Sequence, residues 1–115
     1  YTAPGTTAST TIVSNAFTAS SAPTTSRIVV FQEDLSGSPS GNLNTDIVAS
    51  ISRDGGSNFT NATLSDSGYV TGASGQRILT GVATVSGQPS GTSMRWKLAL
   101  ANNQSKIHGV SLQWK

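Results

Sequence analysis

The sequence predicts an all-β protein, an antiparallel β-sandwich of jelly-roll-like type with about seven to nine short strands. Three observations indicate this class. Serine, threonine and glycine are abundant, whereas the 115 residues include only seven Lys or Arg and five Asp or Glu. Several segments alternate apolar and polar residues, and none shows helical periodicity. Turn-forming residues recur about every ten positions.

The predicted strands follow from these patterns in chain order. "RIVVFQ" is apolar on both faces, which favours a strand in the middle of a sheet. Strict alternation marks the segments that begin at Asp46 and Met94, and Gly81 interrupts another strand as a predicted bulge. In the last strand, His108 is expected to share a face with Val110, Leu112 and Trp114. The predicted strands are 27–32, 46–52, 58–64, 77–87, 94–100 and 107–114.

The first 26 residues are expected to form an extended Thr/Ser-rich arm or an edge strand, and residues 27–115 the β-sandwich. The large aliphatic and phenylalanine side chains of this arm are Ile12, Val13 and Phe17. Ordering an extended arm costs backbone entropy, so we expect a partner surface to stabilise it. Ile12, Val13 and Phe17 are therefore predicted interface residues. Because the sequence begins at Tyr1, we expect a processed chain or the ordered part of a longer one.

Composition argues against several classes of partner. The basic residues are dispersed and form no patch for tracking phosphates, so we expect no nucleic-acid partner. No apolar run is long enough to span a membrane, and we expect no membrane insertion. The chain has no cysteine, which excludes disulfides and thiolate zinc sites. We expect no cofactor.

The most distinctive segment is "ISRDGGSNFTNATL", which matches the Asp-box pattern of β proteins. Ser52, Asp54, Gly56 and Phe59 are its predicted structural residues. Asp54 is expected to accept backbone hydrogen bonds, a glycine to supply positive φ and Phe59 to pack under the turn. Because the motif occurs once, a repeating propeller is excluded. The alternative is that Asp54 binds calcium together with Asp46 or Asp66, although no dense run of acidic residues supports it.

No catalytic or metal-binding residue is predicted. His108 is the one histidine, but no nucleophile motif accompanies it, and its apolar neighbours favour a place at a core edge or subunit interface. Trp96 and Trp114 are expected in the core rather than as platforms for sugars. Tyr69, in a glycine-flanked loop, is the predicted ligand contact. Five carboxylates could form a hydrolytic pair: Glu33, Asp34, Asp46, Asp54 and Asp66. Four of the five lie in predicted turns or loops, where Asp is an ordinary turn residue, so a glycosidase is not expected.

Three segments in order, "ISRDGGSNFTNATL", "VSGQPSGTSMRWKLALANN" and "KIHGVSLQWK", resemble the C-terminal β domain of tailed-bacteriophage fibre and related virion appendage proteins. The resemblance covers about Asn44 to Trp114. It implies a non-enzymatic tail or capsid protein, often a homotrimer, that sometimes binds a host glycan. It implies no catalytic residue.

Two functions remain open. The first is a structural virion protein, a fibre tip or capsid decoration subunit, assembled in the host cytoplasm and displayed on the virion for host attachment. Its partners would be further copies of the chain, with a trimer as first choice, other virion proteins and a surface glycan. The alternative is a free-standing carbohydrate-binding module of a secreted protein.

Overall fold

The computed structural model describes residues 10–34, 43–69, 76–101 and 105–115. Its nine strands pack as two antiparallel sheets, which confirms the predicted β-sandwich. The strands are β1 (Thr10–Val13), β2 (Phe17–Thr18), β3 (Thr25–Asp34), β4 (Ile47–Ser52), β5 (Thr60–Ala62), β6 (Ser65–Tyr69), β7 (Gln76–Thr84), β8 (Ser93–Leu100) and β9 (Ser105–Trp114).

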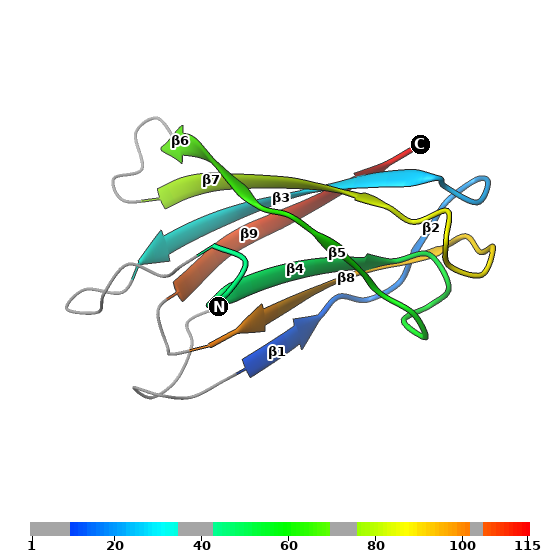
Figure 1. Ribbon diagram of the computed structural model, residues 1–115, viewed down its shortest axis with the longest axis horizontal. Helices are drawn as coiled ribbons and strands as arrows, with labels where there is room; N and C mark the ends of the chain where they lie inside the picture. The colour runs from blue at the N-terminus through cyan, green and yellow to red at the C-terminus, as the bar shows by residue number, and fades with distance from the viewer. Residues whose placement is uncertain (1–9, 35–42, 70–75, 102–104) are drawn as a thin grey trace.

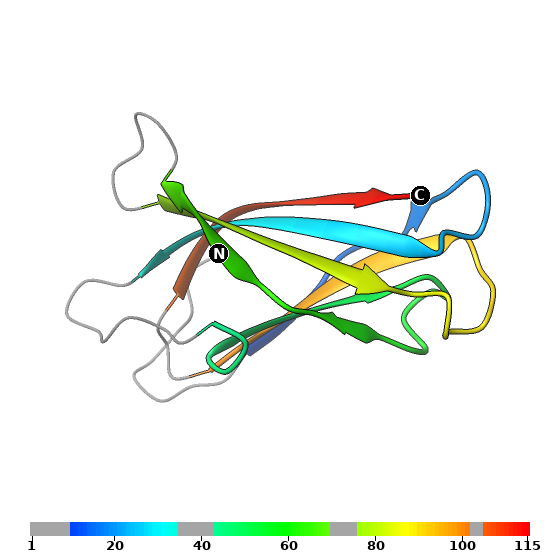
Figure 2. The same ribbon diagram turned by 45° about the horizontal axis from the view of Figure 1, so that its top comes forward.

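One sheet has the strand order β1-β8-β4-β5, with β2 also paired to β8. The other has the order β6-β7-β3-β9, in which the apolar β3 is central, as its sequence predicts. Figure 1 labels these strands, and Figure 2 shows the two layers, with β3 (cyan) in one and β8 (orange) in the other. The chain from β5 to β6 crosses from the first sheet to the second.

The core lies between the sheets and consists of the inward residues of each alternating strand. Ile28 and Val30 of β3, together with Leu98 of β8, are fully buried. Trp96 and Trp114 are half-buried and pack against this core, which confirms their predicted place.

The expected division after residue 26 falls inside β3, so the structure has no boundary there. Of the two interpretations of residues 1–26, the described part supports the edge strand, because β1 pairs with β8 from Thr10↔Leu100 to Val13↔Lys97. Ile12 points inward and packs against the core. Ile12 is only partly buried there, so its predicted role at an interface stays a prediction, and residues 1–9 lie outside the described residues.

Gly81 does not form the predicted bulge, since the β3–β7 register runs without a shift from Thr25↔Thr84 to Glu33↔Gln76. A Cβ atom on Gly81 would lie 2.8 Å from the carbonyl oxygen of Thr63. Glycine is therefore required because the crossover from β5 to β6 passes directly against β7. β6 was not among the predicted strands, because its "SDSGY" sequence is turn-like rather than strand-like.

The predicted face of His108 is wrong. Phe31 pairs with Gly109, whereas the next residue, Gln32, pairs with Ile107. His108 is therefore the extra residue of a β-bulge, and the bulge reverses the alternation on one side of it. Ile107 is buried as a result, and His108 lies on the exposed side of β9.

Candidate functional site

The turn after β4 has the structural role that its sequence predicts. Gly55 and Gly56 adopt φ values of 77° and 98°. The hydroxyl of Ser52 accepts hydrogen bonds from the backbone N–H groups of Asp54 (3.2 Å) and Gly56 (2.9 Å), and donates to Oδ1 of Asp54 (2.7 Å). The Ser52 hydroxyl therefore fixes the backbone of the turn, and the Asp54 carboxylate fixes the orientation of that hydroxyl.

Both carboxylate oxygens of Asp54 accept hydrogen bonds from Asn58. Oδ1 accepts from the backbone N–H (2.9 Å) and Oδ2 from the side-chain amide (2.6 Å). These hydrogen bonds, together with the one from Ser52, lower the pKa of Asp54 from 3.8 to about 2. Asp54 therefore accepts a backbone hydrogen bond as predicted, and the donor lies four residues along the chain.

Phe59 packs back under this turn. Its ring lies 3.7 Å from the position that a Cβ atom on Gly56 would occupy, and the ammonium group of Lys97 lies 4.2 Å from the ring centroid. The cation covers the aromatic face, so Phe59 contributes to the turn rather than to an open binding platform.

The calcium alternative is not supported by the positions of the three aspartates. Asp46 and Asp54 flank the six residues of β4, so strand geometry separates them by roughly 20 Å. Asp66 lies on β6, where its carboxylate is 3.4 Å from the Arg77 guanidinium and accepts from the N–H of Gly68. Among the described residues, no three His, Cys, Asp or Glu side chains are grouped to hold a metal ion.

Arg53, the neighbour of Asp54, is a structural centre that no sequence pattern marks. Its side chain is buried, and its three guanidinium nitrogens donate to four backbone carbonyls. Those carbonyls belong to the segment before β3 and to the β7–β8 turn: Pro23, Ser86, Gln88 and Pro89. The guanidinium therefore joins β4 to connections from both sheets.

Gln88 completes this cluster. Its side-chain oxygen accepts from the N–H of Arg53 (2.8 Å), and its side-chain nitrogen donates to the Ile51 carbonyl (2.8 Å) and the Thr60 hydroxyl (2.9 Å). Gln88 belongs to the "QPSGTS" segment and Arg53 to "SRDGG". The two segments, 35 residues apart, thus form one hydrogen-bonded unit, which we call the Arg53–Gln88 unit.

His108 pairs with Glu33 across the β3–β9 bulge, with Nε2 2.7 Å from the carboxylate oxygen. Both side chains are partly exposed, at 25 and 35 %. The imidazole of His108 is therefore not enclosed in the core of the described fold. No nucleophilic hydroxyl of the described residues forms a hydrogen bond with this ring.

The remaining predicted contact residues lie apart from one another. Val13 and Phe17 are 47 and 43 % exposed on the edge strands β1 and β2. Tyr69 ends β6, and its side chain lies outside the described residues, as does that of Asp34. The structure therefore does not bring the predicted ligand contact and the predicted interface into one site.

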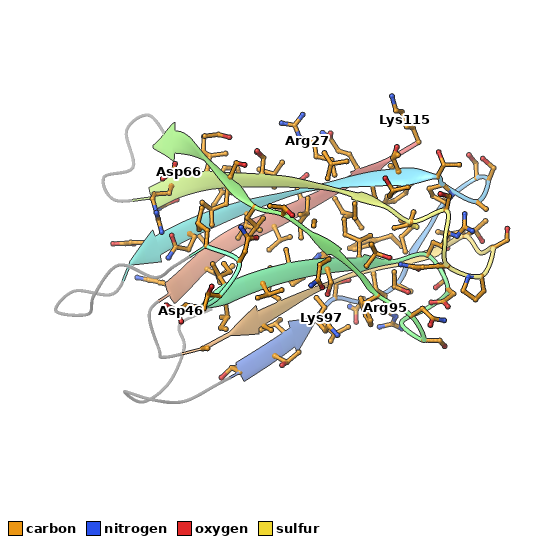
Figure 3. The ribbon with its side chains drawn as sticks, viewed as in Figure 1. Arg27, Asp46, Asp66, Arg95, Lys97 and Lys115 are labelled. Atoms are coloured by element: carbon orange, nitrogen blue, oxygen red, sulfur yellow. The ribbon has the colours of Figure 1, made fainter. Side chains whose placement is uncertain are left out.

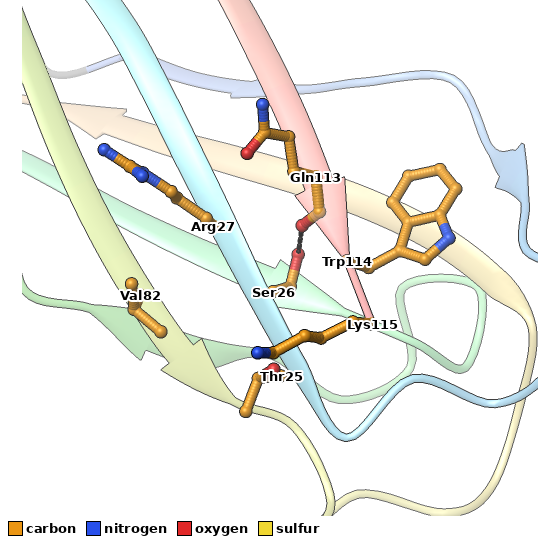
Figure 4. Close-up of a pocket in the computed structure, with 7 residues that line it drawn as sticks. All are labelled: Thr25, Ser26, Arg27, Val82, Gln113, Trp114 and Lys115. Atoms are coloured by element: carbon orange, nitrogen blue, oxygen red, sulfur yellow. Dashed lines mark hydrogen bonds between the residues drawn. The ribbon is translucent and has the colours of Figure 1, made fainter.

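A depression of about 450 Å³ lies at one end of the outer face of β7, β3 and β9 (Figure 4). Arg27, Val82 and Gln113 lie side by side in register across these strands. Lys115 follows at the end of β9, where its N–H and carbonyl pair with Thr25. The residues that line the depression are Thr25, Ser26, Arg27, Val82, Gln113, Trp114 and Lys115.

No sequence pattern marks this depression. Arg27 and Lys115 are 88 residues apart, and no motif links them. Only the antiparallel pairing of β3 with β9 places them on one face. Figure 3 shows both side chains directed away from the sandwich, on the side opposite Arg95 and Lys97.

Comparison with protein-family models, with curated proteins and with solved structures found no match to this chain. No helix in the part of the chain that the structure describes is long and apolar enough to cross a membrane. The resemblance to virion appendage proteins therefore remains a prediction, and the site described above is the basis for proposing a function.

Proposed function

We propose that this chain is a non-enzymatic structural protein of a virion, a fibre tip or decoration subunit of a tail or capsid, that contacts a surface glycan of the host. The observation that carries the proposal is the Arg53–Gln88 unit. Two of the three segments that resemble virion appendage proteins meet in it through hydrogen bonds. Their joint occurrence in the sequence thus has a structural reason, which favours a shared domain over a chance similarity.

The chemistry of the motif residues agrees with a structural role. The polar side-chain atoms of Ser52, Asp54 and Gln88 form hydrogen bonds with backbone groups and with neighbouring polar side chains. A general base or nucleophile needs a free position for a reacting atom within hydrogen-bond distance. Side chains that are committed to holding turns do not offer one.

Exposed apolar residues on the edge strands support contacts between copies of the chain. β1 is the edge of its sheet, so one side of its backbone has no strand partner in the described fold. Val13 on β1 and Phe17 on β2 add exposed apolar surface along the same edge. Closed symmetry is the usual way to cover such an edge, and a trimer is our first choice because the resemblance implies one.

The second candidate is a carbohydrate-binding module that acts as a monomer in a secreted protein. The depression around Arg27 favours it, because a ligand site on a single chain requires no assembly. Both candidates bind a glycan, and they differ in oligomeric state and in whether the chain is part of a particle.

Native mass spectrometry and light scattering of the full chain separate the two candidates. We expect a trimer that dissociates into folded monomers when Val13→Ser and Phe17→Ser are combined, with the β-sheet circular dichroism spectrum retained. Val82→Ser is the matched control, since Val82 is 60 % exposed on the other sheet, and we expect it to keep the trimer. A wild-type chain that stays monomeric at the highest soluble concentration would favour the secreted module.

A further inference from the structure

The depression of Figure 4 carries two positive charges that the described residues do not neutralise. Neither the guanidinium of Arg27 nor the ammonium group of Lys115 forms an ion pair or a hydrogen bond within the part of the chain that is described. The carboxylate of Glu33 pairs with His108, and that of Asp66 with Arg77. The two cations are therefore available to an anionic ligand.

The backbones of Arg27 and Lys115 lie close enough for both long side chains to reach one anionic group. Arg27 is opposite Gln113, and Lys115 lies two residues beyond Gln113, directly after the end of β9 and on the same face. Diagonal neighbours in an antiparallel pair are about 7 to 8 Å apart, so two long side chains can converge on a group between them. The planar guanidinium matches a carboxylate with two parallel hydrogen bonds, and the ammonium group adds a point charge.

The rest of the depression suits a sugar ring. Val82 is 60 % exposed and presents an apolar surface beside Arg27. The amide of Gln113 and the hydroxyl of Thr25 are donors and acceptors for sugar hydroxyls. The volume of about 450 Å³ lies within the usual range of small-molecule sites.

Trp114 lines the depression, but its ring does not form a platform there. The indole of Trp114 points to the opposite side of β9 in Figure 4 and packs against the core. Stacking of a sugar on an aromatic ring, which would bind neutral saccharides, is therefore not offered by the lining residues. Affinity must come mainly from the charges.

We propose that this depression binds a saccharide that carries a carboxylate, either a sialic acid or a uronic acid. This inference rests on the proposed contact with a surface glycan and names the class of that glycan. Arg27 and Lys115 bind the carboxylate, Val82 contacts the ring, and Gln113 binds its hydroxyls. Two cations are too few to track a nucleic-acid backbone, so a polyphosphate chain is not the expected ligand.

The test is an NMR titration of the isotopically labelled full chain in whichever oligomer it forms. The probes are 3′-sialyllactose, trigalacturonate, lactose as the neutral match, and inorganic phosphate. We expect one of the two acidic saccharides to shift the signals of Arg27, Val82, Gln113 and Lys115, and the one that binds identifies the acid. Lactose and phosphate at equal concentration should shift them at least about tenfold less.

Two variants and a control assign the binding to the depression. Arg27→Gln and Lys115→Gln should each weaken binding about fivefold to tenfold. Lys106→Gln removes the same charge from an exposed position on β9 outside the depression and should leave binding unchanged. Spectra of the free variants show whether each one is folded, and with two variants the test does not depend on either alone.

The inference is overturned if neither acidic saccharide shifts these signals, if lactose or phosphate shifts them equally, or if both variants bind as the wild type does. Those outcomes do not contradict the virion proposal, because that proposal is tested separately by the mass of the assembly in native mass spectrometry and light scattering. A monomeric chain that binds the acidic saccharide would instead reject the virion assembly and keep this inference.

Discussion

Asp54 shows how one side chain fixes the conformation of a turn. Its carboxylate accepts hydrogen bonds from Ser52 and Asn58, and these favour the charged form. Because the pKa is lowered to about 2 in the folded chain, the ionised carboxylate stabilises the fold at neutral pH. Protonation in acid removes that contribution.

The first prediction concerns acid stability. The pKa of Asp54 is lower in the folded than in the unfolded chain, so its contribution is complete above about pH 4 and is lost as the pH falls to about 2. We expect Asp54→Asn to lower the melting temperature at neutral pH, and the difference from wild type to shrink across that window. Circular dichroism melts at several pH values check this.

A difference in melting temperature that stays constant from neutral pH to about pH 2 would contradict the role of the charged form. Calcium provides a second control. Because the three aspartates lie apart, adding calcium or a chelator should leave the melting temperature of the wild type unchanged.

The second prediction concerns Arg53. Replacing it by glutamine leaves buried carbonyls of Pro23 and the β7–β8 turn without donors, so we expect Arg53→Gln to lower the free energy of unfolding by about 2 to 4 kcal/mol. Arg27→Gln is the matched control at an exposed arginine and should change it by less than about 0.5 kcal/mol. Urea denaturation measures the free energy of unfolding of both variants. Equal losses in the two variants would refute the structural role of Arg53 in the Arg53–Gln88 unit.

At the scale of elements, the crossover from β5 to β6 shows why a strand can require a glycine at its centre. β5 pairs with β4 in one sheet and β6 with β7 in the other, so residues 63 and 64 bridge the layers. The Thr63 carbonyl reaches the inner face of β7 at Gly81. Any side chain there would push the crossover out of the sandwich.

The third prediction is that Gly81→Ala lowers the free energy of unfolding by about 1 to 3 kcal/mol, because its Cβ would collide with backbone that cannot move independently of β5 and β6. Gly87→Ala is the control, since a Cβ there meets no atom within 4 Å. Denaturant melts of the two variants compare them. Equal stability of Gly81→Ala and wild type would show that the crossover shifts freely.

At the scale of the whole molecule, the strand pairing joins distant parts of the chain. β1 pairs with β8, and β3, at the middle of its sheet, pairs with both β7 and β9. Closing such long loops costs entropy before the contacts form. The Arg53–Gln88 unit adds a further link between connections of the two sheets.

The fourth prediction is therefore slow, cooperative folding. We expect the monomeric chain to refold in milliseconds to seconds, with one transition for both sheets. Stopped-flow fluorescence can follow Trp96 and Trp114, which lie in different sheets and both pack against the core. Refolding in microseconds, or separate transitions for β8 and β9 reported by single-tryptophan variants, would contradict it.

The sequence by itself determined the fold class and the local chemistry of the "SRDGG" turn. Both follow from short-range rules: period-two alternation marks half-buried strands, and Ser, Asp and Gly form turns through neighbouring backbone groups. Ser52, Asp54, Gly56 and Phe59 could be assigned because their partners lie mostly within a few residues.

Tertiary structure alone decided the side chains whose partners are far away in sequence. The bulge opposite Phe31 moved His108 from the predicted core face to the exposed face, since a single extra residue reverses the alternation. The carbonyls that accept from Arg53 lie 30 to 36 residues away in the sequence. The pairing of β3 with β9 places Lys115 on the same face as Arg27. Register between strands is set by the packing of the whole sandwich, and no local pattern in the chain encodes it.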